Sequence, residues 1–166
     1  LDYGSGNRRV GSQSRMASKK TGEGLSVFHP IVARWFERQV GEPTRVQREV
    51  WPRIAAGENV LVTAPTGSGK TLAAFLWSLN QLLTGSWRGG QTKVLYVSPL
   101  RALNNDIQRN LLAPLAQLEI ELEKGGERAE AVRVQTRSGD TPAAERQKMT
   151  RHPPEVLITT PESLNI

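Results

Sequence analysis

The strongest constraint on the fold of this chain lies in residues 63–76, TAPTGSGKTLAAFL. Here Gly67 and Gly69 stand between a short apolar run and an amphipathic one, and Lys70 and Thr71 come directly after the second glycine. Glycine lets a backbone curl tightly and turn its N–H groups toward an anion, and the next helix adds the positive end of its dipole. The pattern therefore predicts a loop that binds phosphate, placed between a strand and a helix.

The rest of the chain alternates between the spacing of helices and that of strands. Apolar residues at helical spacing predict helices over 30–40, from Thr44 onward, over 72–83, over 103–118 with a kink at Pro114, and over 142–149. Short apolar runs predict buried strands over 60–63, 93–98, 132–136 and 156–159, and the charged residues 119–130 predict a surface connection. This alternation favours an α/β fold with a parallel sheet and helices on both faces.

Composition narrows the class of protein. A chain of 166 residues fits one domain, and the absence of cysteine excludes disulfides and cysteine-ligated metals. The net charge of +6 is uneven, because residues 1–20 hold five basic side chains against one acidic (+4), which leaves 17 basic against 15 acidic (+2) in the rest. Net charge alone is therefore weak support for binding of nucleic acid.

The beginning of the chain differs in character from the remainder. Residues 1–24 are rich in glycine, serine and basic side chains and have almost nothing to bury, which predicts a disordered basic leader, or residues added ahead of a natural start at Met16. The folded part is expected over 25–166. Because the chain has neither a long apolar run nor the apolar core of a signal peptide, we expect a soluble, cytoplasmic protein without a membrane partner.

The glycine loop fits a known phosphate-binding pattern. Residues Ala64–Thr71 match the Walker A motif, with alanine in place of the usual first glycine. The residues predicted to bind the nucleotide are Pro65, Thr66, Gly67, Ser68, Gly69, Lys70 and Thr71. We expect Lys70 to reach the β and γ phosphates as the catalytic lysine, and the Thr71 hydroxyl to bind Mg²⁺. The alternative is a Gly-Ser turn that happens to precede a lysine.

Four motifs, in this order, resemble the first RecA-like domain of superfamily 2 helicases of the DEAD/DEAH type. They are PTRVQ (43–47), APTGSGKT (64–71), SPLRAL (98–103) and TTPES (159–163). They correspond to a Q-motif-like segment, the Walker A motif, motif Ia and motif Ib of these enzymes. The resemblance spans 25–166 and is strongest for the large helicase-related (Lhr) group. It implies a P-loop NTPase (RecA-like) fold, with ATP and Mg²⁺ as cofactors.

The role of Gln47 has two interpretations. The resemblance implies that its amide binds the adenine edge, since an amide can donate and accept together. It also implies an upstream aromatic, for which Phe28 is the candidate, stacking on the base. Alternatively, Thr44 and Gln47 have the spacing of a helix capping box, and Phe28 belongs to the core.

Polar and proline-containing loops come after three of the predicted strands. The resemblance implies that they contact the backbone of a single-stranded nucleic acid through Pro99 and Arg101, through Gly139, and through Thr160 and Pro161. Such a surface tolerates any sequence, because it addresses backbone rather than base edges. The resemblance favours DNA over RNA, with 3′ to 5′ translocation. The alternatives are a solvated arginine at 101 and a helix N-cap at Asp140 or Thr141.

No predicted strand ends in the Asp-Glu pair that hydrolysis requires. The resemblance implies a DExH segment later in the parent chain and a second RecA-like domain that supplies arginine fingers. We therefore expect a domain truncated before its DExH strand, which binds ATP and a single strand but neither hydrolyses ATP efficiently nor unwinds a duplex. The alternatives are a stand-alone binding module without catalysis and a P-loop kinase, although a kinase does not predict PTRVQ or TTPES.

Overall fold

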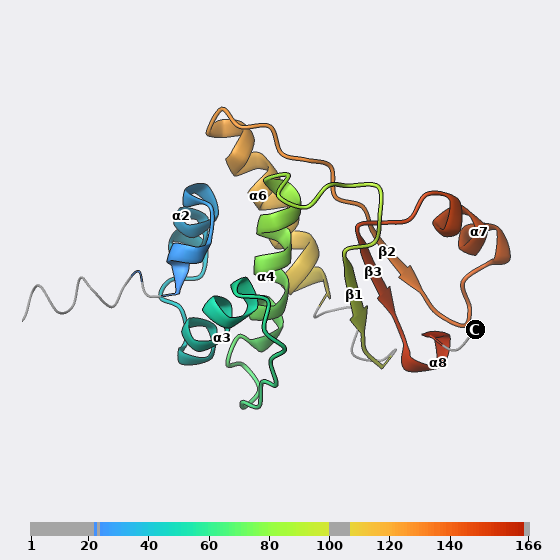
Figure 1. Ribbon diagram of the computed structural model, residues 1–166, viewed down its shortest axis with the longest axis horizontal. Helices are drawn as coiled ribbons and strands as arrows, with labels where there is room; N and C mark the ends of the chain where they lie inside the picture. The colour runs from blue at the N-terminus through green and yellow to red at the C-terminus, as the bar shows by residue number, and fades with distance from the viewer. Residues whose placement is uncertain (1–21, 23, 100–106, 165–166) are drawn as a thin grey trace, which may run out of the picture.

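The structure, a computed structural model, describes residues 22, 24–99 and 107–164 (Figure 1). Most of the predicted leader and Arg101 lie outside these residues. The first elements are the short η1 (Leu25–Val27), α2 (Pro30–Gln39), α3 (Arg45–Ala55) and α4 (Lys70–Leu83). They are followed by β1 (Val94–Val97), the π-helical turn η3 (Gln108–Leu112), α6 (Ala113–Lys124), β2 (Val134–Arg137), α7 (Ala143–Arg151), β3 (Val156–Thr159) and α8 (Pro161–Leu164).

The three strands form one parallel sheet in the order β1-β3-β2. In its register, Val156 of β3 lies opposite Val94 of β1 on one side and Val134 of β2 on the other. Parallel neighbours must be joined by a crossover connection, and the one between β2 and β3 contains α7. Figure 1 shows α4 and α6 on one side of the sheet and α7 and α8 on the other. The predicted α/β fold with a parallel sheet and flanking helices is confirmed.

Helix α4 lies at the centre of the hydrophobic core, between the sheet and the pair α2 and α3 (Figure 1). On the side of α3, the indole N–H of Trp51 donates to the Ala73 carbonyl at 3.0 Å. On the side of the sheet, Phe75 meets Tyr96 of β1 with ring centroids 4.9 Å apart. Because α4 is buried on several faces, its N-terminal end is held in a fixed position.

The apolar residues of the second sheet face are only partly covered. Leu95 is 51% exposed and Val97 40% exposed, while α7 buries none of its residues. Within the described ranges, no helix combines the length and the apolar character needed to cross a bilayer. Large apolar side chains of the described part are also exposed outside the sheet, among them Val40, Ile120 and Leu164.

Two predictions for individual segments were wrong. Residues 60–63 form no strand, and Leu61 is 91% exposed. Sheet pairing needs a neighbour, and the described strands pair only among themselves, so this apolar segment lacks the ladder that would make it a strand. The second error concerns 119–130, because α6 continues through Lys124 and buries Leu118 and Leu122.

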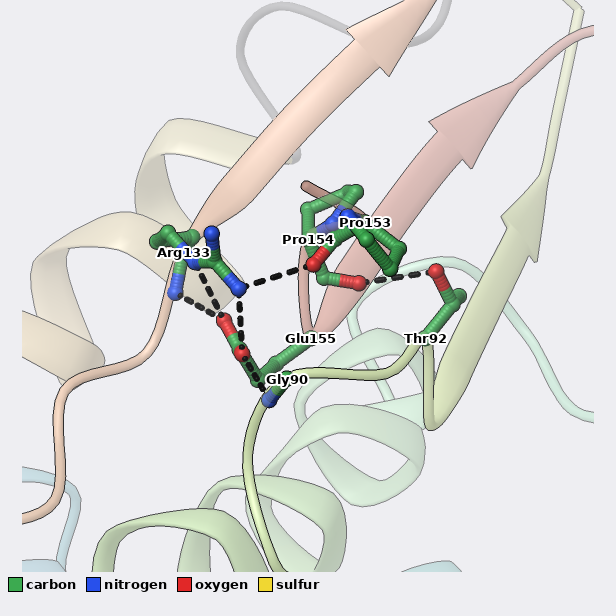
Figure 2. Close-up of polar contacts among 6 residues, drawn as sticks. All are labelled: Gly90, Thr92, Arg133, Pro153, Pro154 and Glu155. Atoms are coloured by element: carbon green, nitrogen blue, oxygen red, sulfur yellow. Dashed lines mark hydrogen bonds and ion pairs between the residues drawn. The ribbon is translucent and has the colours of Figure 1, made fainter. Parts of the chain in front are cut away.

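One carboxylate connects the amino ends of all three strands (Figure 2). Glu155 immediately precedes β3, and its Oε1 accepts hydrogen bonds from Gly90 N–H at 2.8 Å and from Arg133 Nη2 at 2.9 Å. Its Oε2 accepts from the backbone N–H and the Nε of Arg133, at 2.8 and 3.2 Å. Since Gly90 leads into β1 and Arg133 into β2, Glu155 joins the segments that enter the sheet.

The Glu155 side chain is only 3% exposed, so its ionisation depends on these donors. Burial raises the pKa of the Glu155 carboxyl, but the hydrogen bonds from Arg133 and Gly90 outweigh burial and lower that pKa to about 2, from an ordinary 4.5. A carboxyl with a depressed pKa in the folded state stabilises the fold above the pKa of the unfolded chain. That stabilisation is lost as the pH falls from about 4.5 toward 2.

We expect Glu155→Gln to lower the free energy of unfolding at pH 7 by about 3 kcal/mol, because the variant keeps the shape but loses the charge. Its unfolding free energy should also change less than that of the wild type between pH 4.5 and 2. Urea titrations across this range measure both effects. Glu145→Gln, at an exposed position of α7, is the control and should leave both unchanged. A Glu155 variant with the pH dependence of the wild type would refute this role.

Candidate nucleotide site and strand-binding edge

The glycine loop leads into α4 through two left-handed glycines. Gly67 has a φ of 83° and Gly69, the N-cap of α4, a φ of 81°, conformations that other residues adopt only at a cost. Helices α2 and α3 are capped by the side chains of His29 and Thr44, whereas α4 has no side-chain cap. The first N–H groups of α4 thus stay available to an anion.

Lys70 closes the loop upon itself. Its ammonium donates hydrogen bonds to the carbonyl of Ala64 and, at 2.7 Å, to that of Pro65. Both acceptors belong to the loop, so the lysine satisfies carbonyls that the curled backbone turns inward. Lys70 and Thr71 also line a pocket of about 400 Å³. The other lining residues are Val50, Ile54, Val60, Val62, Ala73, Ala74 and Tyr96.

The capping box of α3 is also hydrogen-bonded to the glycine loop, and we call this pair of contacts from Thr44 and Gln47 the brace of the loop. Gln47 Oε1 accepts from Thr44 N–H at 2.9 Å, and Thr44 Oγ1 accepts from Gln47 N–H at 3.3 Å. The same two side chains then donate to the loop, Thr44 Oγ1 to Ser68 O at 2.9 Å and Gln47 Nε2 to Gly69 O at 3.3 Å. Gln47 is 1% exposed. Gln47, which is predicted to contact adenine, therefore lies under the loop in this structure. Both its amide oxygen and its amide nitrogen are hydrogen-bonded.

Phe28, the candidate for stacking on a base, lies in the core. It is 7% exposed and packs edge-on against Trp51 and Trp77, with ring centroids 4.8 and 5.9 Å apart. Aromatic pairs in this arrangement contribute beyond the area that they bury. The structure therefore agrees with the second interpretation of Phe28 given from the sequence, in which this residue belongs to the core.

The residues of the loop fit a phosphate group. Pro65, Thr66 and Gly67 are exposed, while Ser68, Gly69, Lys70 and Thr71 are half-buried. Among the described residues, the buried hydroxyl of Ser68 has no hydrogen-bond partner, which leaves a donor free. The described part contains no group of three His, Cys, Asp or Glu side chains that could hold a metal ion. A Mg²⁺ here would depend on Thr71, phosphate oxygens and water, an arrangement that Mg²⁺ favours.

The described residues among those predicted to contact a strand follow the carboxyl ends of the three parallel strands, which point to one edge of the sheet (Figure 1). Pro99 is exposed two residues after β1, whereas Arg101 lies outside the described residues. Gly139 lies in the turn between β2 and α7, and nothing stands within 4 Å of the position that a Cβ would take there. The turn is therefore open to an approaching backbone.

Thr160 and Pro161 differ in their accessibility. Thr160 is 1% exposed, and its Oγ1 donates to Ser163 Oγ at 3.2 Å, while Ser163 N–H donates to the Thr160 carbonyl at 3.0 Å. A bond within the first turn of α8 thus engages the Thr160 hydroxyl. Pro161 is exposed. The edge presents Pro99, Gly139 and Pro161 to solvent and keeps Thr160 inside its own turn.

Sequence reasoning missed Arg146, which holds the turn around Gly139. Its Nε donates to the Thr141 carbonyl and its Nη2 to the Gly139 carbonyl, at 2.8 and 2.7 Å. The expected N-cap role of Thr141 is also different in the structure, because Thr141 Oγ1 accepts from Ser138 N–H, ahead of the turn, at 2.8 Å. No motif points to Arg146. In the sequence, an arginine near the start of a polar helix cannot be distinguished from one whose side chain is exposed to solvent.

The family of the chain is shown by comparison with known proteins. Residues 44–166 match the DEAD/DEAH box helicase family. This range begins at Thr44 of the capping box and contains the glycine loop and all three strands. The chain belongs to this family of helicases.

Within the family, the chain is similar to Lhr helicases. It is 48% identical over 148 residues to the Lhr helicase/uracil glycosylase of Escherichia coli (strain K12), a match that covers 83% of this chain and 9% of that protein. It is 46% identical to the ATP-dependent helicase Lhr-Core of Sulfolobus acidocaldarius over 86% of this chain and 16% of the relative. The chain therefore spans only a small part of the length of these relatives.

A solved structure of Mycobacterium smegmatis helicase Lhr bound to ssDNA and AMP-PNP shares the fold. The TM-score is 0.77 at 47% identity, and the match covers 86% of this chain and 18% of the other. The comparison confirms the RecA-like helicase fold as well as the sequence resemblance to the Lhr group.

The brace beneath the loop can be tested with a matched pair of glycine variants. Gly67→Ala and Gly69→Ala should each cost about 1 to 2 kcal/mol of unfolding free energy, because both glycines are left-handed. A Cβ at Gly67 meets nothing within 4 Å, but at Gly69 it would lie 2.5 Å from Gln47 Nε2. Gly69→Ala should therefore cost about 1 kcal/mol more, by breaking the bond from Gln47.

Urea unfolding of both variants measures this difference. In a Gln47→Ala background the excess cost of Gly69→Ala should disappear, since the displaced partner is gone. Equal losses for the two glycine variants in the wild-type background would contradict the brace.

Proposed function

We propose that this chain is the ATP-binding and strand-contacting part of an ATP-dependent DNA helicase. The observation that carries the proposal is the glycine loop with Lys70 at the uncapped start of α4. The family membership and the Lhr relatives support the same function. We place the protein in the cytoplasm, where its substrates would be found.

In the proposed ATP complex, Lys70 exchanges partners. The ammonium leaves the carbonyls of Ala64 and Pro65 and donates to the β and γ phosphate oxygens, which are stronger acceptors because they are charged. The N–H groups of Gly67, Gly69, Lys70 and Thr71 and the free hydroxyl of Ser68 donate to the remaining oxygens, while the Ser68 N–H stays bonded to the Pro65 carbonyl at 3.3 Å. Pro65 and Thr66 form the outer rim.

Two further roles belong to the proposal. The Thr71 hydroxyl would hold Mg²⁺, which neutralises charge on the transferring phosphate. Gln47 would bind the adenine edge after releasing at least one of its present partners, Thr44 N–H or Gly69 O. An exchange of this kind would link base recognition to the position of the loop.

A single strand would lie along the carboxyl edge of the sheet. Pro99, Arg101, Gly139, Thr160 and Pro161 are the residues proposed to contact it. We favour DNA, because a similar Lhr helicase was solved with ssDNA. With contacts to the backbone rather than to base edges, binding would show little sequence preference.

Hydrolysis and unwinding would need parts beyond these 166 residues. The sequence contains no Asp-Glu pair at the end of a predicted strand. This is the pair expected to bind Mg²⁺ and to position the attacking water. We propose that a DExH segment and a second RecA-like domain occur elsewhere in a longer parent protein. The small share of the relatives that this chain spans supports this.

The first test is a titration of the chain with a fluorescent ATP analogue and Mg²⁺. Lys70→Ala should weaken binding roughly ten- to a hundredfold, because it removes a charge-assisted contact with phosphate. Lys93→Ala, which removes an exposed lysine next to β1, is the control and should bind like the wild type. Equal affinity of the wild type and Lys70→Ala would argue against the phosphate site.

The second test compares hydrolysis by this chain and by the full-length protein. We expect the chain to bind ATP without measurable turnover, and the full-length protein to hydrolyse ATP faster when single-stranded DNA is added. Release of phosphate, followed over time, measures both. Turnover by the chain at the rate of the full-length protein would show that the acid pair is not needed, and a full-length protein without turnover would favour a binding module.

A further inference from the structure

We infer that Arg146 is a positioning residue for the single strand, which it serves by fixing the turn that carries Gly139. The inference rests on the strand-binding edge proposed above and adds a residue that no motif includes. Arg146 is the fourth residue of α7, and its side chain returns to the turn that precedes the helix.

The guanidinium spans the turn. Nε donates to the Thr141 carbonyl at 2.8 Å and Nη2 to the Gly139 carbonyl at 2.7 Å, so one rigid group holds two peptide units. The planar fork of arginine fixes the distance between its donors, which a lysine ammonium cannot do. Thr141 Oγ1 supplies a second anchor by accepting from Ser138 N–H at 2.8 Å.

These bonds decide which N–H groups of the turn remain free. Ser138 N–H and Thr141 N–H are both bonded within the turn. Gly139 N–H and Asp140 N–H have no hydrogen-bond acceptor in the described part of the chain. In a trans peptide the N–H of Asp140 points opposite to the Gly139 carbonyl, and therefore away from Arg146. By binding the Gly139 carbonyl, Arg146 thus directs the free N–H of Asp140 to the opposite side of the turn.

The surroundings of Gly139 suit this role. No atom lies within 4 Å of the position that a Cβ would take on Gly139, so a phosphodiester backbone can approach. Arg146 itself is half-buried and engaged with carbonyls, whereas Lys148 and Arg151 of the same helix are exposed. The geometry makes Arg146 a support for the turn rather than a charge directed at the strand.

The test measures binding of a fluorescent oligo-dT by the full-length protein over a range of salt concentrations. Arg146→Ala and Arg146→Lys should both weaken binding roughly five- to thirtyfold, because the turn loses its bridge in either case. The slope of log Kd against log salt should stay at the wild-type value. A direct phosphate contact would instead lower that slope by about 0.7, and lysine would restore it.

Controls separate the turn from the rest of the protein. Lys148→Ala removes the same charge from an exposed position of α7 and should not affect affinity beyond a small general electrostatic change. Thr141→Val removes the second anchor without changing any charge, and should weaken binding at an unchanged slope. Affinity for the ATP analogue and the melting temperature should stay close to the wild type in the Arg146→Lys and Thr141→Val proteins.

The outcomes are distinct. Wild-type affinity in Arg146→Lys, or a reduced salt slope in Arg146→Ala, would overturn the positioning role and leave the proposed strand-binding function intact. Failure of the wild-type protein to bind the oligonucleotide would refute the strand-binding function itself, and the role of Arg146 with it. Weakened binding at an unchanged slope in Arg146→Lys and Thr141→Val supports the inference.

Discussion

The burial of α4 is the constraint on which the rest of the structure depends. This helix joins the two halves of the core, with Trp51 on one side and the Phe75–Tyr96 contact on the other. It also begins at the glycine loop, so the apolar packing that stabilises the fold sets the position and direction of the N–H groups available for phosphate. Close-packed interiors resist deformation. A loop attached to such a helix is therefore anchored at one end even though its tip is exposed.

The two edges of the sheet have different roles. At the amino edge, Glu155 closes a network of hydrogen bonds with Arg133 and Gly90, with almost no exposure of the carboxylate. At the carboxyl edge, Gly139 and the prolines that come after β1 and β3 are open to solvent. Open α/β sheets commonly place ligands beyond the carboxyl ends of their strands, and a sheet fastened at the opposite end allows loops to vary there without loss of register.

Much of the fold could be predicted from the sequence, because the information is local. The helix over 30–39, the strand over 156–159 and the left-handed loop glycines are set by apolar spacing and by the conformational freedom of glycine. The failure at 60–63 has a different cause, since a strand needs a partner that periodicity does not identify. The bonds from Gln47 to Gly69 and from Arg146 to Gly139 were also missed, because they depend on how separate elements meet.

The bonds from Lys70 to the carbonyls of Ala64 and Pro65 would compete with ATP for the same ammonium at the proposed phosphate site. In the proposed function Lys70 has two arrangements, the observed one bonded to the loop and an open one that could receive a ligand. The measured affinity for ATP would then equal the intrinsic affinity multiplied by the fraction of molecules in the open arrangement. Any change that weakens the acceptors at Ala64 and Pro65, including a shift of the backbone far from the nucleotide, would tighten binding without adding a contact to it.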